Sequence, residues 1–264
     1  MTSMTLEQWV DRQQARGKYT FLRSDAVEQS GLSAEAVKKA LQRLVKRGRL
    51  VKVKDYFFVI VPLEYAAAGA PPPSWYVHDL AVAMRVSYYV GLLSAAAQYG
   101  AAHQSPQEFQ VIADRYVRPL VVGRGRIRFL TSKYVELASV IDHKTPTGAM
   151  RVSTPETTAF DLVRFRHAAG GLDQVAGVIA ELASQLDAQR LLAAVKRVHD
   201  VPNAQRLGYL LDRLGAKALS KPLHEWLDRQ SPRRIPLRSG RPVDRATEDH
   251  RWHVLLDAPL EVET

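Results

Sequence analysis

The stretch Ser33–Val61, SAEAVKKALQRLVKRGRLVKVKDYFFVIV, decides the fold of the first part of the chain. Ser33 is a typical helix N-cap, and Gly48 suits the position just after a helix end. The apolar residues between them have the i, i+4, i+7, i+8 spacing of one buried helical stripe: Val37, Leu41, Leu44 and Val45. Two further apolar runs flank Asp55, which predicts a β-hairpin after the helix.

The residues before Ser33 predict two more helices. One runs from Leu6 to Arg16 and ends at Gly17, and a short one runs from Ser24 to Ser30. Gly31 and Leu32 then form the tight turn into the helix that starts after Ser33. Two helices joined by a short turn and followed by a hairpin predict a winged helix-turn-helix domain over residues 1–63.

The predicted third helix and hairpin are strongly basic. Eight cations and no acid fall within the 17 residues Lys38–Lys54. A helix-turn-helix places its second helix in the major groove of DNA, and cations on the hairpin can reach neighbouring phosphates. The alternative interpretation is a solvated charged helix face, although such a face usually mixes both signs. The candidate DNA-binding residues are Ser33, Lys38, Lys39, Arg43, Lys46, Arg47, Arg49, Lys52 and Lys54.

Composition agrees with an anionic partner. The 264 residues include 37 Lys plus Arg against 27 Asp plus Glu, a net charge of +10. Residues 1–69 hold 12 of these cations and 7 of the acids, and therefore half of the surplus. The absence of cysteine excludes disulfides, zinc–cysteine sites, iron–sulfur clusters and a cysteine nucleophile. We expect neither a metal nor a cofactor.

The chain also lacks a membrane signal. Glu7 and Asp11 lie where a signal peptide needs an apolar core, and the long uncharged run Val86–Gln107 is too polar in its second half to span a bilayer. We therefore expect a cytoplasmic protein that does not associate with membranes.

Composition changes at residues 64–74, EYAAAGAPPPS, where three prolines favour an extended, semi-rigid linker. The remaining residues 75–264 predict a larger mixed domain. It begins with a helix over residues 78–99 and continues with strands between 109 and 152. Helices follow from 154 to 229, then a loop at 231–249. Strands and helices that are grouped rather than alternating predict an α+β fold.

Two arginine clusters lie in this larger domain. The first flanks a predicted pair of strands and is either a second nucleic-acid surface or a set of surface ion pairs: Arg115, Arg118, Arg124, Arg126 and Arg128. The second lies in the loop at 231–249 and has no assigned role: Arg233, Arg234, Arg238, Arg241 and Arg245.

A capping box is predicted at Ser153–Glu156, where Ser153 precedes Glu156 by three residues and Pro155 suits a first helical turn. An enzyme is the main alternative to a DNA-binding protein. Asp114, Asp142 and Lys144 loosely resemble the acid and lysine arrangement of metal-dependent nucleases. A third hypothesis is a plain transcriptional regulator whose second domain senses a ligand.

Four stretches of the larger domain resemble the motifs of AbiEi antitoxins, in the order of that family: SYYVGLLSAAAQYGAAHQ (87–104), STPETTAFDLVRF (153–165), AGGLDQV (169–175) and RLGYLLDRLG (206–215). Together with the predicted winged helix, the resemblance covers nearly the whole chain. It offers no catalytic residues, so we do not expect an enzyme.

The resemblance implies an antitoxin of a type IV toxin–antitoxin system, active in phage abortive infection. The implied partner is a nucleotidyltransferase-like toxin that is counteracted without a stable complex. The resemblance also implies a DNA-binding autorepressor that recognises inverted repeats in its own operator. A monomer or weak dimer would suffice, because two monomers can bind the two repeats cooperatively.

Overall fold

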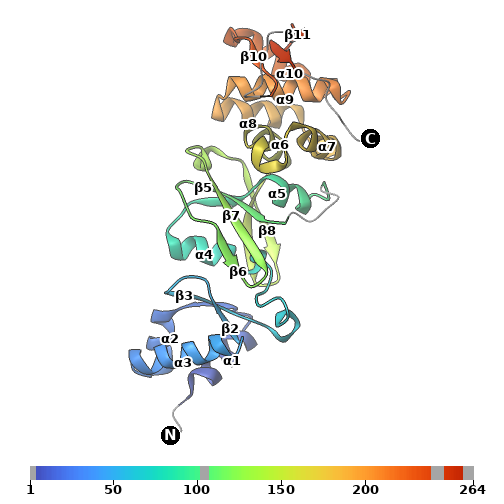
Figure 1. Ribbon diagram of the computed structural model, residues 1–264. Coiled ribbons are helices and arrows are strands. Elements are labelled where there is room, and N and C mark those ends of the chain that lie inside the picture. Colours follow the sequence, from blue (N-terminus) through green and yellow to red (C-terminus); the bar gives the residue numbers. More distant parts are fainter. Residues whose placement is uncertain (1–3, 102–106, 239–246, 258–264) are drawn as a thin grey trace. The chain divides into compact units, whose positions relative to one another are not determined.

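The computed structural model describes residues 4–101, 107–238 and 247–257 (Figure 1). Contacts divide the chain into two compact units. The first contains Met1–Tyr89, Gln107–Lys133 and Asp142–Arg151. The second contains Val90–Pro106, Tyr134–Ile141 and Val152–Thr264. Helices and strands both contribute to the fold, which confirms the α+β class.

The N-terminal elements have the order that the winged helix-turn-helix prediction requires, with one added strand. They are α1 (Leu6–Ala15), β1 (Thr20–Leu22), α2 (Arg23–Ser30), α3 (Ala34–Lys46), β2 (Leu50–Lys52) and β3 (Phe57–Ile60). The strands form an antiparallel sheet in the order β1-β3-β2. Gly31 ends α2 in the left-handed region, with φ of 70°, which a glycine adopts without strain.

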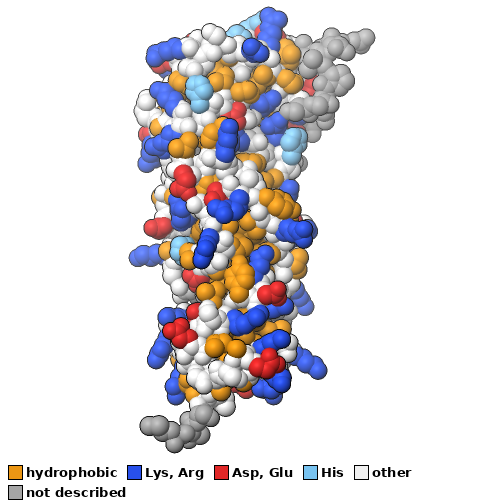
Figure 2. All heavy atoms as spheres, turned by 90° about the vertical axis from the view of Figure 1, so that its left-hand side faces the viewer, with side chains coloured by type: hydrophobic (Ala, Val, Ile, Leu, Met, Phe, Trp, Pro, Cys, Tyr) orange, Lys and Arg blue, Asp and Glu red, His pale blue; other side chains and the backbone are white. Residues whose placement is uncertain are grey.

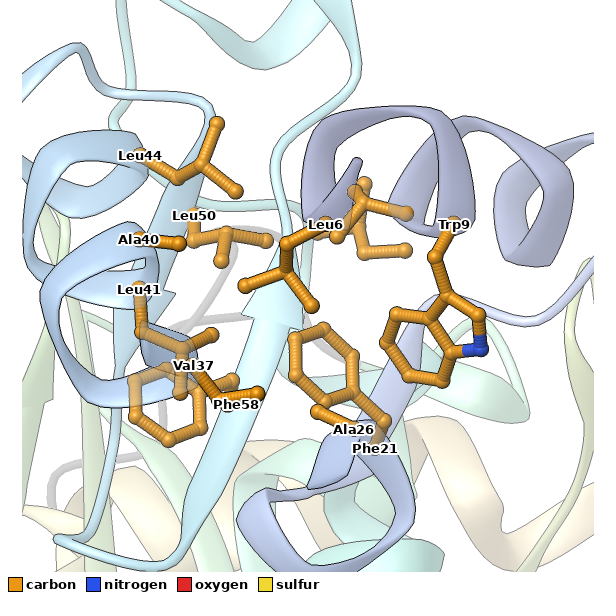
Figure 3. Close-up of a cluster of buried hydrophobic side chains, with 12 residues drawn as sticks. Leu6, Trp9, Phe21, Ala26, Val37, Ala40, Leu41, Leu44, Leu50 and Phe58 are labelled. Carbon is orange, nitrogen blue, oxygen red and sulfur yellow. The ribbon is translucent and has the colours of Figure 1, made fainter. Parts of the chain in front are cut away.

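One hydrophobic core holds these elements together (Figure 3). The apolar stripe of α3 faces α1 and the sheet, and Val37, Leu41 and Leu44 are buried. Trp9 of α1 meets Phe21 of β1 edge to face, with ring centroids 5.0 Å apart. Aromatic pairs of this geometry add stabilisation beyond the area they bury, and they help to fix how α1 lies against the sheet.

Residues 64–74, predicted as a semi-rigid linker, contain short turns and an extended Pro72, with φ of −55° and ψ of 144°. Two 3-10 turns bound the segment, η1 (Leu63–Tyr65) and η2 (Pro73–Trp75). The rings of Tyr65 and Trp75 meet edge to face at 5.3 Å, and the backbone N–H of Arg124 donates to the Ala68 carbonyl at 2.8 Å. Because these contacts join the segment to the first unit, the division of the chain does not fall at the prolines.

A six-stranded sheet, most of which lies in the first unit, has the order β6-β7-β5-β4-β9-β8. Its strands are β4 (Tyr88–Val90), β5 (Phe109–Ala113), β6 (Leu120–Val122), β7 (Gly125–Thr131), β8 (Val140–Thr145) and β9 (Gly148–Ser153). β5 runs parallel to β7, and β6 is antiparallel to β7. Strands β5, β6, β7 and β9 overlap the runs rich in Val and Ile between residues 109 and 152.

The helix predicted over residues 78–99 is wrong as a single element. The structure divides it into α4 (Val77–Met84), β4 and α5 (Leu92–Gln98). Arg85 ends α4 in the left-handed region, with φ of 54°. The following Tyr-Tyr-Val sequence favours a strand, and all three side chains are buried. An apolar run that is buried on every side has no periodicity to separate helix from strand.

The second unit is mainly helical. Its helices are α5, α6 (Pro155–Arg164), α7 (Leu172–Leu182), α8 (Ala188–Val198), α9 (Val201–Arg213) and α10 (Lys217–Leu227). Short 3-10 turns lie between them: η3 (Val135–Leu137), η4 (Arg166–Ala169), η5 (Ala183–Gln185) and η6 (Asp228–Gln230). Within the region 109–152, where strands are predicted, Val135–Leu137 therefore form turn η3, and β8 begins only at Val140.

The predicted loop at 231–249 contains strands. β10 (Ile235–Pro236) and β11 (Thr247–Asp249) flank β12 (Val254–Leu256) in a small sheet. The buried Arg206 of α9 fixes β10, because its guanidinium donates to the carbonyls of Pro236 at 2.9 Å and Leu237 at 3.1 Å. No local sequence pattern predicts these hydrogen bonds, because Arg206 and β10 are far apart in the sequence.

The capping box at Ser153–Glu156 is also wrong by one residue. Thr154 is the N-cap of α6, and its hydroxyl accepts from the backbone N–H of Thr157 at 3.4 Å. Glu156 is instead buried, accepts from the backbone N–H of Asp187 at 3.2 Å and pairs with Arg190 at 3.0 Å. Its role is structural, because it ties the start of α6 to the start of α8.

Among the described residues, no helix has the length and apolar character needed to cross a membrane.

Candidate nucleic-acid interface

Helix α3 exposes one continuous outer face. Its buried stripe centres on Val37 and Leu44, so at 100° per residue the opposite side passes through Glu35, Lys39 and Lys46. Ser33 caps the helix, and its hydroxyl accepts from the backbone N–H of Ala36 at 3.2 Å. The local sequence therefore aims a polar, mostly cationic face away from the core, with its N-terminal turn exposed.

Four candidate cations have no acidic partner among the described residues: Lys38, Arg43, Lys46 and Lys54. The three on α3 are exposed, and Lys54 is partly exposed. Lys39 lies 3.9 Å from Glu35, one helical turn earlier, at a site where both side chains are mostly solvated. Such a surface pair contributes little, so Lys39 is free to exchange Glu35 for a phosphate.

Arg47 and Arg49 have structural partners on α1. Arg47 lies 3.4 Å from Glu7, and both side chains are exposed. Arg49 is only 25% exposed and donates to Asp11 at 2.8 Å and to the Val61 carbonyl at 3.1 Å. It therefore joins α1 to the end of the sheet. Charge alone predicts DNA contact for Arg49, whereas its contacts show a structural role.

The β2–β3 hairpin has a short tip. Lys52 ends β2 and pairs with Asp55 at 3.0 Å, while Lys54 lies beyond the strand, in the tip itself. The Lys52 ammonium lowers the pKa of Asp55. Arg23 at the start of α2 donates to the Asp55 carbonyl, and its backbone N–H donates to the Tyr56 carbonyl at 2.9 Å. These bonds tie the hairpin tip to α2.

Tyr56 is a residue that charge counting misses. It lies at the hairpin tip beside Lys54, and 43% of it is exposed although it is large and apolar. Its exposed ring, two residues after Lys54 in the sequence, is accessible to a binding partner. The sequence indicates that Tyr56 lies at the hairpin tip, because it directly follows Asp55 in the predicted turn.

The excess of positive charge is visible on the surface. Figure 2 shows one face of the molecule, where Lys and Arg side chains predominate over Asp and Glu. The cations are interspersed with other side chains rather than gathered in one place. The net charge therefore does not indicate which elements bind nucleic acid. The local arrangement of exposed cations on each element is the better guide.

The first arginine cluster is largely paired. Arg126 and Arg128 of β7 share Glu108, at 3.1 and 3.5 Å. Arg115 binds Asp114 through two hydrogen bonds of 3.1 and 2.9 Å, which lower the pKa of Asp114. Arg118 and Arg124 are exposed and have no acidic partner in the described part of the chain. Ion pairs thus account for three members of the cluster, and two remain available.

The second arginine cluster falls partly outside the described residues, where Arg241 and Arg245 lie. Arg234 pairs with Glu248 of β11 at 2.9 Å. Arg238 pairs with Asp173 at 2.8 Å and Asp257 at 3.3 Å. Arg234 therefore pairs within the small C-terminal sheet, whereas Arg238 joins Asp257, just after β12, to Asp173 of α7.

The three residues of the nuclease hypothesis, Asp114, Asp142 and Lys144, do not form a common site. Asp114 follows β5, whereas Asp142 and Lys144 lie on β8, and the strands β4 and β9 separate the two. Three strand spacings place them roughly 14 Å apart. Asp114 is also bound by Arg115. Among the described residues, no group of three or more His, Asp or Glu side chains is arranged to hold a metal ion.

The chain is similar to known proteins both in sequence and in fold. The sequence model of the AbiEi antitoxin C-terminal domain matches residues 89–213. The crystal structure of the RV2827C protein from Mycobacterium tuberculosis has the same fold, with a TM-score of 0.71 over 95% of this chain and 90% of that chain, at 13% identity. No curated protein matches the sequence. Residues 89–213 are therefore similar to the C-terminal domain of AbiEi antitoxins.

Proposed function

We propose that this protein is the antitoxin of a type IV toxin–antitoxin system and represses its own operon by binding DNA through α3 and the β2–β3 hairpin. The match of residues 89–213 to the AbiEi antitoxin C-terminal domain supports an antitoxin role. The observation that supports DNA binding is the outer face of α3, where Lys38, Arg43 and Lys46 are exposed and lack acidic partners among the described residues.

In this proposal α3 lies in the major groove. Lys38, Lys39, Arg43 and Lys46 bind phosphates, which gives affinity but carries no sequence information. Sequence would be read by the exposed N-terminal turn, where Glu35 can accept a hydrogen bond from a cytosine amino group and Ser33 can bind either strand's bases. Lys52 and Lys54 at the hairpin bind the neighbouring backbone.

The proposed target is an inverted repeat in the operator, occupied by two monomers or a weak dimer. The proposed functional partner is a nucleotidyltransferase-like toxin, counteracted in the cytoplasm without a stable complex. Neutralisation is assigned to the domain at residues 89–213, because that is the part that matches the antitoxin family.

A full-length variant can separate the two activities. Residues 1–63 share a compact unit with the sheet, so removing them would damage more than DNA binding. Replacing Lys38, Lys39 and Arg43 by Ala leaves the core of α3 intact, because all three side chains are exposed. We expect this variant to lose repression of a reporter driven by its own upstream region, and to retain rescue of cells that express the adjacent toxin.

The matched control replaces Lys217, Lys221 and Arg229, three exposed cations at α10 and η6, by Ala. It changes the net charge equally and should keep repression. Equal repression by both variants would contradict the assignment to α3. Rescue that disappears together with repression would show that antitoxin action depends on DNA binding.

The first arginine cluster supports a second proposal. Arg118 and Arg124 would extend the nucleic-acid surface beyond the winged helix, since Arg115, Arg126 and Arg128 already have acidic partners. Replacing Arg118 and Arg124 by Ala should then weaken binding to long DNA while leaving binding to a short operator duplex unchanged. A loss on both substrates would place the two arginines at the operator itself.

A further inference from the structure

We propose that a cavity in the first unit binds a small organic cation with an aromatic or alkyl body. The cavity has a volume of about 440 Å³ and is open to solvent. Binding sites for small molecules typically measure roughly 300–1,000 Å³. Its walls come from β1, the first turn of α2, β3, η2, α4 and the turn before β9. None of these elements belongs to the outer face of α3.

The first observation is a fixed aromatic wall. Tyr19, Phe57 and Trp75 line the cavity. The indole of Trp75 contacts Tyr19 edge to face at 5.0 Å and Tyr65 at 5.3 Å. Its backbone carbonyl accepts from the Thr147 hydroxyl at 2.6 Å. These contacts hold an aromatic ring in place before any ligand arrives, as recognition of a cation by an indole requires.

The second observation is the charge of the lining. Asp25 and Asp79 both face the cavity, and neither pairs with a Lys or Arg among the described residues. Asp79 accepts from the Thr20 hydroxyl at 2.5 Å, and Asp25 accepts from the backbone N–H of Leu22 at 3.0 Å. Lys18 also lines the cavity. Two carboxylates against one ammonium leave a negative site in a segment that is otherwise positive.

The two observations together define the ligand. The acidic lining repels phosphates, so the cavity is not an extension of the DNA surface. The apolar side chains of Val82 and Ala83 and the aromatic wall favour a hydrophobic body, whereas the carboxylates favour a protonated amine. A neutral or anionic molecule of the same shape would contact the apolar and aromatic side chains, but the carboxylates would not attract it. This inference does not depend on the proposed function.

Three ligands of one shape test the assignment: 2-phenylethylamine, 2-phenylethanol and phenylacetate. The readout is the set of tryptophan indole N–H signals in NMR spectra of the full chain, where Trp75→Phe identifies the signal of Trp75. We expect the amine to shift that signal saturably, and the alcohol and the carboxylate to bind much more weakly. No saturable shift with the amine, or equal shifts with all three ligands, would overturn the proposal.

Two variants locate the site. Asp79→Asn keeps the shape of the side chain and should weaken amine binding roughly tenfold, because one close carboxylate no longer attracts the cation. Ala83→Leu fills part of the cavity without changing any charge, and should also weaken binding. Glu225→Gln removes an exposed acid on α10 as the control for net charge. If Asp79→Asn or Ala83→Leu binds the amine as tightly as the control does, the amine occupies another place.

Discussion

Arg43 and Arg49 are close in sequence, yet their side chains have different surroundings. Arg43 is exposed on α3 and has no acidic partner in the described part of the chain. Arg49 is mostly shielded from solvent and donates to Asp11 and the Val61 carbonyl. The helical spacing of apolar residues predicts the exposure of Arg43. It cannot predict the partners of Arg49, because Asp11 lies in another helix, 38 residues away.

This difference predicts opposite effects of alanine substitution. Arg49→Ala should lower the free energy of unfolding by about 1–3 kcal/mol, because a partly buried charged hydrogen-bond network loses its donor. Arg43→Ala should change stability by less than about 0.5 kcal/mol, while weakening DNA binding. Urea unfolding measured beside fluorescence anisotropy with operator DNA separates the two effects. Equal loss of stability in both variants would contradict the roles assigned here.

Gly208 shows how a single residue can fix a tertiary contact. In α9, the neighbour that packs against Gly208 is Trp252. A Cβ atom at position 208 would lie 2.0 Å from the indole, so the ring would have to move. Trp252 is fully buried, and its indole N–H donates to Asp212 at 2.8 Å.

Gly208→Ala should therefore destabilise the protein by about 1–3 kcal/mol through overpacking. Gly177→Ala in α7 is the matched control, because nothing lies within 4 Å of its Cβ position. That substitution should instead stabilise the helix by about 0.5–1 kcal/mol. The midpoints of thermal unfolding should move in opposite directions. Parallel shifts would show that Trp252 does not pack against Gly208.

At the scale of elements, amphipathic segments were predictable and fully buried ones were not. Helix α3 has one apolar stripe, and its predicted and observed ends agree within a residue. The segment 78–99 is apolar on most sides, and the strand β4 within it forms because neighbouring strands are present. Its Tyr-Tyr-Val sequence favours a strand locally, but the competing helical pattern around it hid that preference.

The segment 64–74 also shows that local sequence does not determine how a segment packs. Three prolines favour an extended chain locally, yet the segment packs against the turn between β6 and β7. Gly123 makes this approach possible, since a Cβ atom there would lie 2.4 Å from the Ala68 carbonyl oxygen. The φ of Gly123, +59°, also favours glycine.

Gly123→Ala should release residues 64–74 from the sheet. We expect faster proteolytic cleavage within this segment, mapped by mass spectrometry, because detached backbone is accessible to proteases. Gly125→Ala, in the same hairpin, has its nearest neighbour at 3.4 Å and is the control. Cleavage of residues 64–74 at the wild-type rate in Gly123→Ala would contradict the packing described here.

For the whole molecule, net charge indicated the class of partner but not the binding surface. The surplus of +10 includes arginines that serve as internal braces, such as Arg164, Arg206 and Arg238. The cavity beside Trp75 was not predictable, because its walls come from separate parts of the chain and its two carboxylates follow no motif. Periodicity predicts which faces are buried, whereas the pairing of distant side chains requires the fold.

We propose that α3 binds the phosphates of operator DNA. The most direct measurement is the salt dependence of operator binding for the wild type, for the variant with Lys38, Lys39 and Arg43 replaced by Ala, and for the α10 control variant. Each lost phosphate contact should reduce the slope of log affinity against log salt by about 0.9. We expect a slope about 2–3 units shallower for the α3 variant and an unchanged slope for the control. Identical slopes for all three proteins would contradict the claim.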